Sequence, residues 1–152
     1  YIHKEQADKT VPKEARNIVL DVVKGLIHLH SIGIVHRDIK PHNIVKVGER
    51  WKLVDFGISR DTAVPQVSHT IRTIVTPGFC APEQMTSKSA APEMDVYAVG
   101  KLIVYLLRAS TDRDLIRDDS NWWPIVDECT QVNADIRQPL SWVQQKLEGF
   151  GG

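Results

Sequence analysis

Apolar residues recur at intervals of three and four positions over residues 13–30, a spacing that predicts an amphipathic helix. The face expected to be buried consists of Ala15, Ile18, Val19, Val22, Val23, Leu26 and Ile27. The polar positions expected to point outward are Arg16, Asp21 and Lys24. Nothing in this pattern suggests chemistry, so the helix is expected to be structural.

Both ends of this helix carry local signals. Thr10, with Pro12 close behind, predicts its start, because a hydroxyl caps free amide hydrogens and proline is tolerated in a first turn. Gly33 predicts its end, since glycine readily takes a positive φ. The next residues, Ile34–Val35, predict a two-residue strand.

Two further runs have the character of strands, Ile44–Val47 and residues 51–54, with a turn through Gly48 between them. They predict a hairpin. Residues 95–107 are almost wholly apolar, which predicts a central helix buried on every side. A membrane span is the alternative, but it needs roughly 20 apolar residues, and this run is shorter and interrupted by Lys101.

Two more apolar stretches, residues 122–129 and 140–150, predict the last helices. Their aromatic residues are expected to be core. A stacking role for Trp122 and Trp123 is the alternative, but no basic residues are interleaved with them. Residues 57–76 have no sustained period and predict a loop. The fold class expected is mainly α with a small β-hairpin, an α+β arrangement.

Composition adds little to this picture. The 152 residues, 42% hydrophobic and 25% charged, fit one globular domain. A formal net charge of +0 gives no reason to expect nucleic acid or a membrane as partner. Cys80 and Cys129 fit no metal-ligand spacing and are expected to be free thiols. With no signal peptide before Tyr1, an intracellular, cytoplasmic location is the expectation.

The loop at residues 36–43 concentrates the chemistry, because it holds a carboxylate, a cation and a carboxamide within a few positions. Asp38 could accept the proton of an attacking hydroxyl, and Lys40 could lie against the charge of a phosphate in transfer. Asn43 could offer its carbonyl oxygen to Mg²⁺. The hairpin would then return Asp55, the first residue of Asp-Phe-Gly, beside Asp38 as a second metal ligand.

These motifs, followed by Ala-Pro-Glu at residues 81–83, resemble the eukaryotic-type protein kinase family in order and spacing. The resemblance implies the fold of that family's C-terminal lobe over residues 1–152. It also implies ATP and Mg²⁺ as cofactors, with ATP held by Lys40, Asn43 and Asp55 and the metal held by Asn43 and Asp55. Lys40 is similar to the lysine of serine/threonine kinases, so the implied partner is a protein with a Ser or Thr hydroxyl.

The resemblance also implies structural and regulatory residues. His36 and Arg37 precede the catalytic aspartate, and Phe56 is the middle residue of Asp-Phe-Gly. Thr76 is similar to the threonine whose hydroxyl reaches the catalytic aspartate and lysine. Asp95 resembles a carboxylate that accepts amide hydrogens of the catalytic loop.

A late motif at residues 133–137 resembles the one whose arginine pairs with the glutamate of Ala-Pro-Glu, so Glu83 and Arg137 are expected to meet. Arg37 suggests a switch in which a phosphate on Thr70 or Thr73 binds its guanidinium. The alternative is that these threonines are ordinary loop residues and Arg37 pairs with a fixed carboxylate.

The family's glycine-rich loop, strand lysine and helix glutamate have no counterpart in the 152 residues. The expectation is therefore a C-terminal lobe that needs an N-terminal lobe as partner and is inactive alone. A non-catalytic kinase-like scaffold stays open as a second class. Small-molecule phosphotransferases are a third, although they would not be expected to combine Lys40 with Ala-Pro-Glu.

Overall fold

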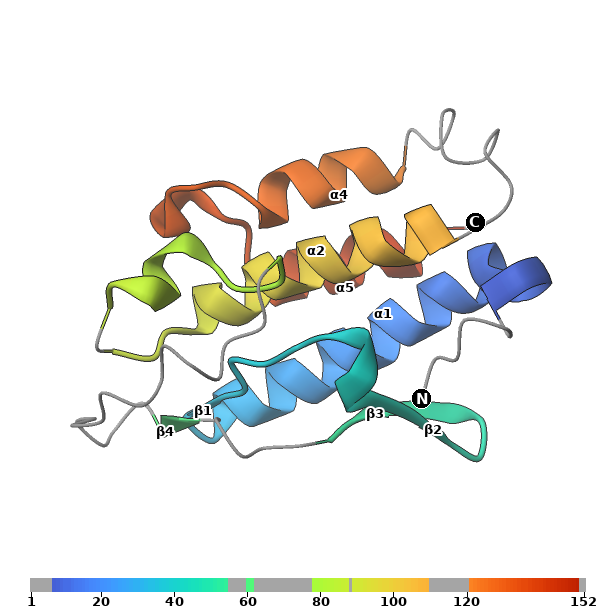
Figure 1. Ribbon diagram of the computed structural model, residues 1–152, viewed down its shortest axis with the longest axis horizontal. Helices are drawn as coiled ribbons and strands as arrows, with labels where there is room; N and C mark the ends of the chain where they lie inside the picture. The colour runs from blue at the N-terminus through green and yellow to red at the C-terminus, as the bar shows by residue number, and fades with distance from the viewer. Residues whose placement is uncertain (1–6, 55–59, 62–77, 88, 110–120, 151–152) are drawn as a thin grey trace.

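The computed structural model describes residues 7–54, 60–61, 78–87, 89–109 and 121–150. Two long helices, α1 (Ala7–Ser31) and α2 (Pro92–Ala109), lie side by side at the centre of the molecule (Figure 1). The shorter α4 (Trp122–Cys129) packs on α2, and α5 (Leu140–Glu148) packs on α1. This mainly helical arrangement with a small hairpin is the predicted fold class.

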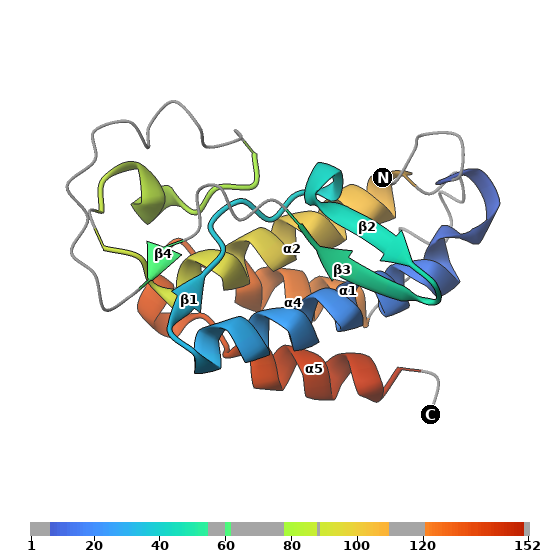
Figure 2. The ribbon, with the colours of Figure 1, turned by 90° about the horizontal axis from the view of Figure 1, so that it is seen from below.

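The hairpin consists of β2 (Ile44–Val47) and β3 (Arg50–Leu53), which pair antiparallel with Ile44 opposite Leu53. Figure 2 shows it lying across α1, with β3 against the helix. The predicted hairpin is present, but its second strand begins and ends one residue earlier than expected. The turn therefore needs only two residues, with Gly48 at a φ of 63°.

One pairing was not predicted from the loop-like run at residues 57–76. The two-residue strand β4 (Arg60–Asp61) pairs antiparallel with β1 (Ile34–Val35). Two residues are too few to show a period, so a local pattern could not reveal this contact between distant parts of the chain. The turn before β1 is as expected, since Gly33 has a φ of 80° and follows the end of α1.

The predicted start of the first helix was wrong, because α1 begins at Ala7, ahead of Thr10. Pro12 therefore lies inside α1, where a proline removes one backbone hydrogen bond and can kink a helix without ending it. The central helix also extends beyond its predicted ends, to Pro92 and Ala109. It is not buried on every side, since Tyr105 is 39% exposed.

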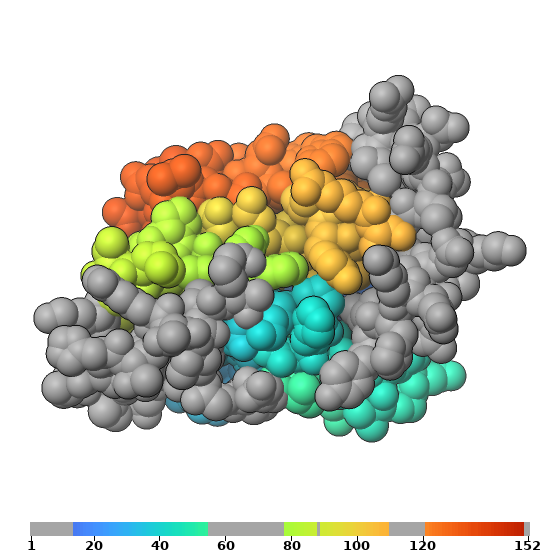
Figure 3. All heavy atoms as spheres, viewed as in Figure 1, coloured from blue at the N-terminus to red at the C-terminus, as the bar shows by residue number. Residues whose placement is uncertain are grey.

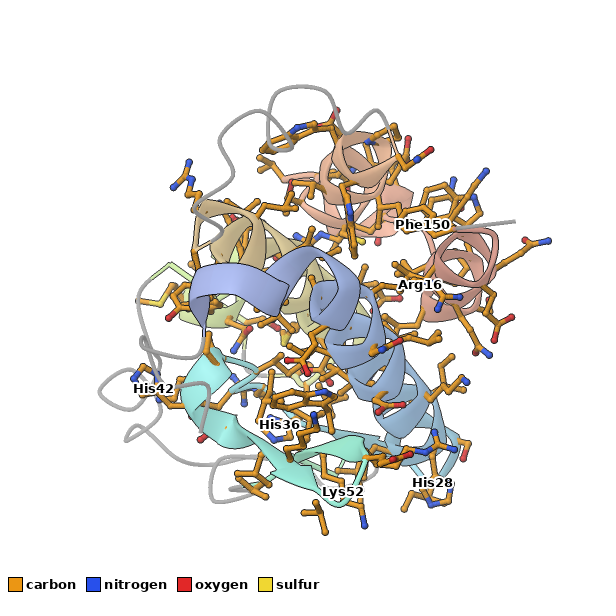
Figure 4. The ribbon with its side chains drawn as sticks, turned by 90° about the vertical axis from the view of Figure 1, so that its right-hand side faces the viewer. Arg16, His28, His36, His42, Lys52 and Phe150 are labelled. Atoms are coloured by element: carbon orange, nitrogen blue, oxygen red, sulfur yellow. The ribbon has the colours of Figure 1, made fainter. Side chains whose placement is uncertain are left out.

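Two residues expected to point to solvent from α1 instead contact other elements. Arg16 donates from Nε to the carbonyl oxygen of Leu147, 2.8 Å away near the end of α5. Figure 4 shows Arg16 on the side of α1 that faces α5. Asp21 binds the hairpin through both carboxylate oxygens. Only Lys24 of the three is exposed as expected. A helical period identifies the strongest apolar face but not a second, polar contact face.

One hydrophobic core joins α1, α2, α4 and α5. Its fully buried members include Leu26 of α1, Leu102 and Leu106 of α2, Ile125 of α4 and Leu147 of α5. Trp122 is buried and meets Phe150 edge to face with ring centres 5.0 Å apart, so these aromatics are core, as expected. In the described part of the chain, no helix combines the length and the apolar character that crossing a bilayer requires.

Candidate active site

The loop at residues 36–43 runs from β1 to the short 3-10 helix η1 (Pro41–Asn43) and buries several polar side chains. His36 is fully buried, and Arg37, Asp38 and Asn43 are each at most 8% exposed. Such groups are stable inside a protein only when hydrogen bonds replace their water. Figure 3 shows this part of the chain, in cyan, at the middle of one face beside the green 78–87 segment and α2.

Asp95, in the first turn of α2, holds the start of this loop. Its Oδ2 accepts the His36 amide hydrogen at 2.9 Å, and its Oδ1 accepts the Arg37 amide hydrogen at 2.8 Å. His30 donates from Nε2 to the same Oδ2 at 2.8 Å. The carboxylate is fully buried, and these donors compensate for the water it has lost.

Arg37 has a φ of 72°, which is the left-handed region that non-glycine residues rarely adopt. This conformation costs about 1–2 kcal/mol and persists only where the surroundings impose it. Here the Arg37 amide is bonded to Asp95, and its carbonyl oxygen accepts from Gln84 Nε2 at 3.2 Å. The strained peptide is thus held from α2 on one side and from the 3-10 helix η3 (Pro82–Met85) on the other.

The His36 ring joins the loop to the end of the hairpin. Its Nδ1 accepts the Asp38 amide hydrogen at 3.1 Å, so the ring hydrogen sits on Nε2, which donates to the Val54 carbonyl oxygen at 3.2 Å. The Val54 amide in turn donates to the Asn43 carbonyl oxygen at 2.8 Å. Figure 4 shows His36 between α1 and the hairpin, whereas His42 lies at the periphery.

Asp38, Lys40 and Asn43 come together around one carboxylate. Asn43 donates from Nδ2 to the Asp38 carbonyl oxygen at 2.8 Å and to its Oδ2 at 3.1 Å. Lys40 Nζ lies 3.4 Å from the same Oδ2. Because the amide nitrogen of Asn43 is engaged by Asp38, its Oδ1 is the part of the side chain left to meet a cation. In this arrangement a proton acceptor and a positive charge lie side by side.

The expected contact between Glu83 and Arg137 is present. The Arg137 guanidinium binds both carboxylate oxygens, with Nη2 3.0 Å from Oε2 and Nη1 bonded to Oε1. It also donates to three carbonyl oxygens, those of Glu93, Gln131 and Val132. Tyr97 lies under the guanidinium, with its ring centre 5.0 Å from Cζ.

Two pKa shifts accompany this arrangement. Burial alone would raise the pKa of Glu83, but hydrogen bonds and the charge of Arg137 outweigh burial and hold the pKa of that carboxyl below its usual value. Burial raises the pKa of the Cys80 thiol, and the charge of Glu83 adds to the rise while Arg37 opposes it. The site therefore contains an ionised carboxylate and a protonated thiol near neutral pH.

The remaining residues implied by the resemblance lie outside the described residues. They are Asp55, Phe56, Thr70, Thr73 and Thr76. In the described part of the chain, no three His, Cys, Asp or Glu residues gather in a way that could hold a metal ion. Their roles, and those of Asp38, Lys40 and Asn43 in catalysis and ATP or metal binding, stay predictions.

Sequence reasoning missed His30 and Gln84, which hold the loop through Asp95 and Arg37. His30 stands in the last turn of α1, where a polar residue is ordinary. Gln84 follows Ala-Pro-Glu directly, and its position beside that motif was the only available signal. Neither residue type is unusual at its position, so the pattern alone did not single them out.

The comparisons with known proteins agree with these motifs. The family model described as "Protein kinase domain" matches residues 2–146, and the chain therefore belongs to the protein kinase family. Serine/threonine-protein kinase F of Synechocystis is 35% identical over 97% of this chain and 31% of its own length. PrkC of Bacillus subtilis is 39% identical over 63% of this chain and 15% of its own length.

AfsK of Streptomyces coelicolor, also named a serine/threonine-protein kinase, is 27% identical over 90% of this chain and 20% of its own length. The chain thus spans less than a third of the length of each of these three relatives. What the whole protein does is therefore a matter of proposal.

Proposed function

We propose that these residues form the catalytic lobe of a serine/threonine protein kinase, which transfers the γ-phosphoryl group of ATP to a protein hydroxyl. The observation that carries the proposal is the cluster of Asp38, Lys40 and Asn43 around the Asp38 carboxylate. The names of the relatives, all serine/threonine kinases, support the choice of Ser or Thr as acceptor.

In the proposed step, the substrate hydroxyl oxygen forms a bond to the γ-phosphorus while the bond from that phosphorus to the bridging oxygen breaks, and ADP leaves. The hydroxyl proton passes to a carboxylate oxygen of Asp38. Lys40, 3.4 Å from Asp38 Oδ2, lies where it can offset negative charge on the transferring group. Asn43 orients Asp38 through its two hydrogen bonds.

The residues fit a magnesium ion in their chemistry. Mg²⁺ prefers oxygen ligands, often one or two protein groups together with substrate phosphates. Asn43 Oδ1 receives no hydrogen bond from the described residues, and Asp55 follows Val54, whose backbone is bonded to the loop. A bound Mg²⁺ would neutralise phosphate charge, with Asn43 and Asp55 as its protein ligands.

Replacement of Asp38 tests this proposal in the full-length protein with ATP, Mg²⁺ and a Ser/Thr peptide. Asp38→Asn should lower kcat by about a hundredfold or more, because general-base assistance contributes about 10²–10⁴-fold. The matched control is Asp127→Asn, an exposed carboxylate on α4 outside the cluster, which should leave kcat unchanged. If the wild-type protein transfers no phosphate, the scaffold class is favoured instead.

A second experiment tests the metal assignment. Asp55→Asn should abolish turnover, because it removes the charge that holds the metal. Asn43→Ala should raise the Mg²⁺ concentration needed for half-maximal rate. Unchanged rates in Asp55→Asn would refute Asp55 as a metal ligand without touching the role of Asp38.

We also propose that the 152 residues have no measurable kinase activity alone. Positioning supplies much of the acceleration in phosphoryl transfer, and this sequence has no glycine-rich loop to clamp the phosphates. An N-terminal lobe would complete the nucleotide site. Turnover by the purified 152-residue chain would overturn this point.

The proposed regulation places a phosphate from Thr70 or Thr73 against Arg37. A phosphothreonine adds about −1.5 to −2 charges and several acceptor oxygens, which suit a guanidinium. Mass spectrometry of the active protein should find phosphate on one of these residues, and the double substitution of Thr70→Ala and Thr73→Ala should lower activity. Full activity in the double variant, with no phosphate between residues 57 and 76, would contradict the switch.

A further inference from the structure

Asp21, midway along α1, binds the backbone of the hairpin. Its Oδ2 accepts the Trp51 amide hydrogen at 2.9 Å, and its Oδ1 lies 3.2 Å from Nη1 of Arg50. The Asp21 side chain is only 14% exposed, although it carries a charge in the middle of a helix. A charged group so placed is retained against its desolvation cost by the bonds that it makes.

The other ion pair between α1 and the hairpin is of a different kind. Glu14 and Lys46 meet at 3.2 Å, but their side chains are 41% and 45% exposed and neither bonds the backbone of the other element. Arg50 is 70% exposed, so its own contact with Asp21 is weak as well. Among the polar contacts described between this helix and the hairpin, the hydrogen bond from the Trp51 amide to Asp21 is the one made by the backbone.

The hairpin depends on such an anchor. Within the described residues, β2 and β3 pair only with each other, and a lone two-stranded hairpin is marginally stable in water. Ile44 lies in the core, and Trp51 and Leu53 pack against it. These apolar contacts hold the hairpin against the helices, but apolar burial is non-directional, so it resists small rotations of the hairpin over α1 only weakly. A hydrogen bond is directional, so the one to Asp21 restrains that rotation.

The far end of the hairpin is bonded to the site. Ile44 pairs with Leu53, the Val54 amide donates to the Asn43 carbonyl oxygen at 2.8 Å, and His36 Nε2 donates to the Val54 carbonyl oxygen at 3.2 Å. A rotation of the hairpin at Trp51 would therefore shift Val54 against both Asn43 and His36.

We propose that Asp21 is a positioning residue for phosphoryl transfer. By holding the Trp51 amide, it fixes the hairpin so that Val54 keeps its bonds to Asn43 and His36, and Asn43 stays where it would meet the Mg²⁺ and nucleotide of the proposed function. This inference rests on the proposed function for its catalytic part, whereas the anchoring itself is a property of the fold.

Amide hydrogen exchange of the full-length protein tests the anchoring without any assay of activity. Asp21→Ala should speed exchange at the Trp51 and Val54 amides by about tenfold or more, as expected for loss of a charge-assisted hydrogen bond. Exchange in α2 and α5 should stay within about twofold of wild type. Asp21→Asn keeps a carbonyl acceptor for the Trp51 amide and should retain most of the protection.

Steady-state kinetics test the catalytic part. Asp21→Ala should raise the Mg²⁺ concentration at half-maximal rate and lower kcat/KM for ATP by about tenfold, with KM for the peptide unchanged. Asp21→Asn should rescue most of this loss. The matched control is Glu14→Ala, which removes the exposed ion pair between the same helix and the same hairpin and should change neither the exchange nor the kinetics.

The outcomes separate the two levels of the proposal. Unchanged exchange at Trp51 in Asp21→Ala overturns the anchoring, and a uniform rise over α1, α2 and the hairpin overturns it in favour of a merely stabilising role. Faster exchange with normal Mg²⁺ and ATP dependence overturns the positioning role. A wild-type protein with no kinase activity refutes the proposed function and with it the catalytic part, while exchange still decides the anchoring.

Discussion

Replacing Arg137 with alanine should destabilise the protein strongly, because one side chain joins three separate segments. The Arg137 guanidinium binds the Glu83 carboxylate in η3, the Glu93 carbonyl oxygen in α2, and two carbonyl oxygens of the turn before its own residue. Its side chain is fully buried in this contact. Truncation removes every one of these donors at once.

The size of the effect follows from what is left behind. Removing one partner of a buried ion pair costs about 3–5 kcal/mol, because the other charge loses its compensation. The Glu83 side chain keeps 25% exposure and can recover some water, which places the expected loss near the lower end, about 3 kcal/mol. Against a total stability of about 5–15 kcal/mol, this is a large fraction.

Thermal and urea denaturation measure the loss. A domain of this size should melt about 6–12 °C lower in Arg137→Ala, at about 2–4 °C per kcal/mol. With an m-value of about 2 kcal/mol/M, the urea midpoint should fall by about 1.5 M. Arg137→Lys is the matched control. It keeps the charge but loses the bidentate contact, so its stability should lie between those of wild type and Arg137→Ala.

A double-mutant cycle with Glu83→Ala isolates the pair from the carbonyl contacts. The two single substitutions should be non-additive, with a coupling energy of about 1 kcal/mol or more. A melting temperature in Arg137→Ala within about 2 °C of wild type, or additive effects in the cycle, would refute the argument that this ion pair holds the segments together.

Three further predictions concern the pair and the helix packing. The folded pKa of Glu83 lies below that of a free glutamate, so its contribution to stability is complete above the unfolded pKa and is lost as the pH falls through the folded pKa. Wild type should therefore lose more stability than Glu83→Gln between pH 5 and pH 3 in urea titrations, and equal losses would count against the shift. Gly100→Ala should destabilise the protein by about 1–3 kcal/mol in denaturation measurements, because an added Cβ would lie 2.6 Å from Thr130 Cγ2 and 2.8 Å from Cys129 Cβ. A neutral result would mean that α2 and α4 separate at little cost. Burial, with a smaller contribution from Glu128, raises the pKa of the Cys129 thiol to about 12, while the charge of Arg137 opposes the rise. Iodoacetamide at pH 8 should therefore alkylate Cys129 only after unfolding. Rapid labelling of the native protein would contradict this burial.

Local patterns were sufficient for the main elements. The three-and-four spacing on α1, the apolar run of α2 and the two short runs of the hairpin follow from side-chain periodicity, which each segment carries in its own residues. Asp38 and Asn43 are only five positions apart, so a short loop is enough to bring their side chains into contact. Family membership follows from the same residues.

Contacts between residues far apart in the sequence could not be predicted from local patterns. The ion pair between Glu83 and Arg137 was expected only because the motifs resemble those of a family, since no local rule connects positions this far apart. His30, Gln84 and Asp21 were missed or assigned to solvent, because their partners are backbone atoms or carboxylates of other elements.

The physical reason is that a buried hydrogen bond depends on geometry created by packing. Asp21 looks like any polar residue on a helix until β3 is laid against α1, and only then does the Trp51 amide come within reach. Arg37 similarly adopts its left-handed φ because Asp95 and Gln84 hold both sides of its peptide, and no property of arginine itself predicts that conformation. Sequence by itself determined which residues could do chemistry, and tertiary structure decided which neighbours hold them in place.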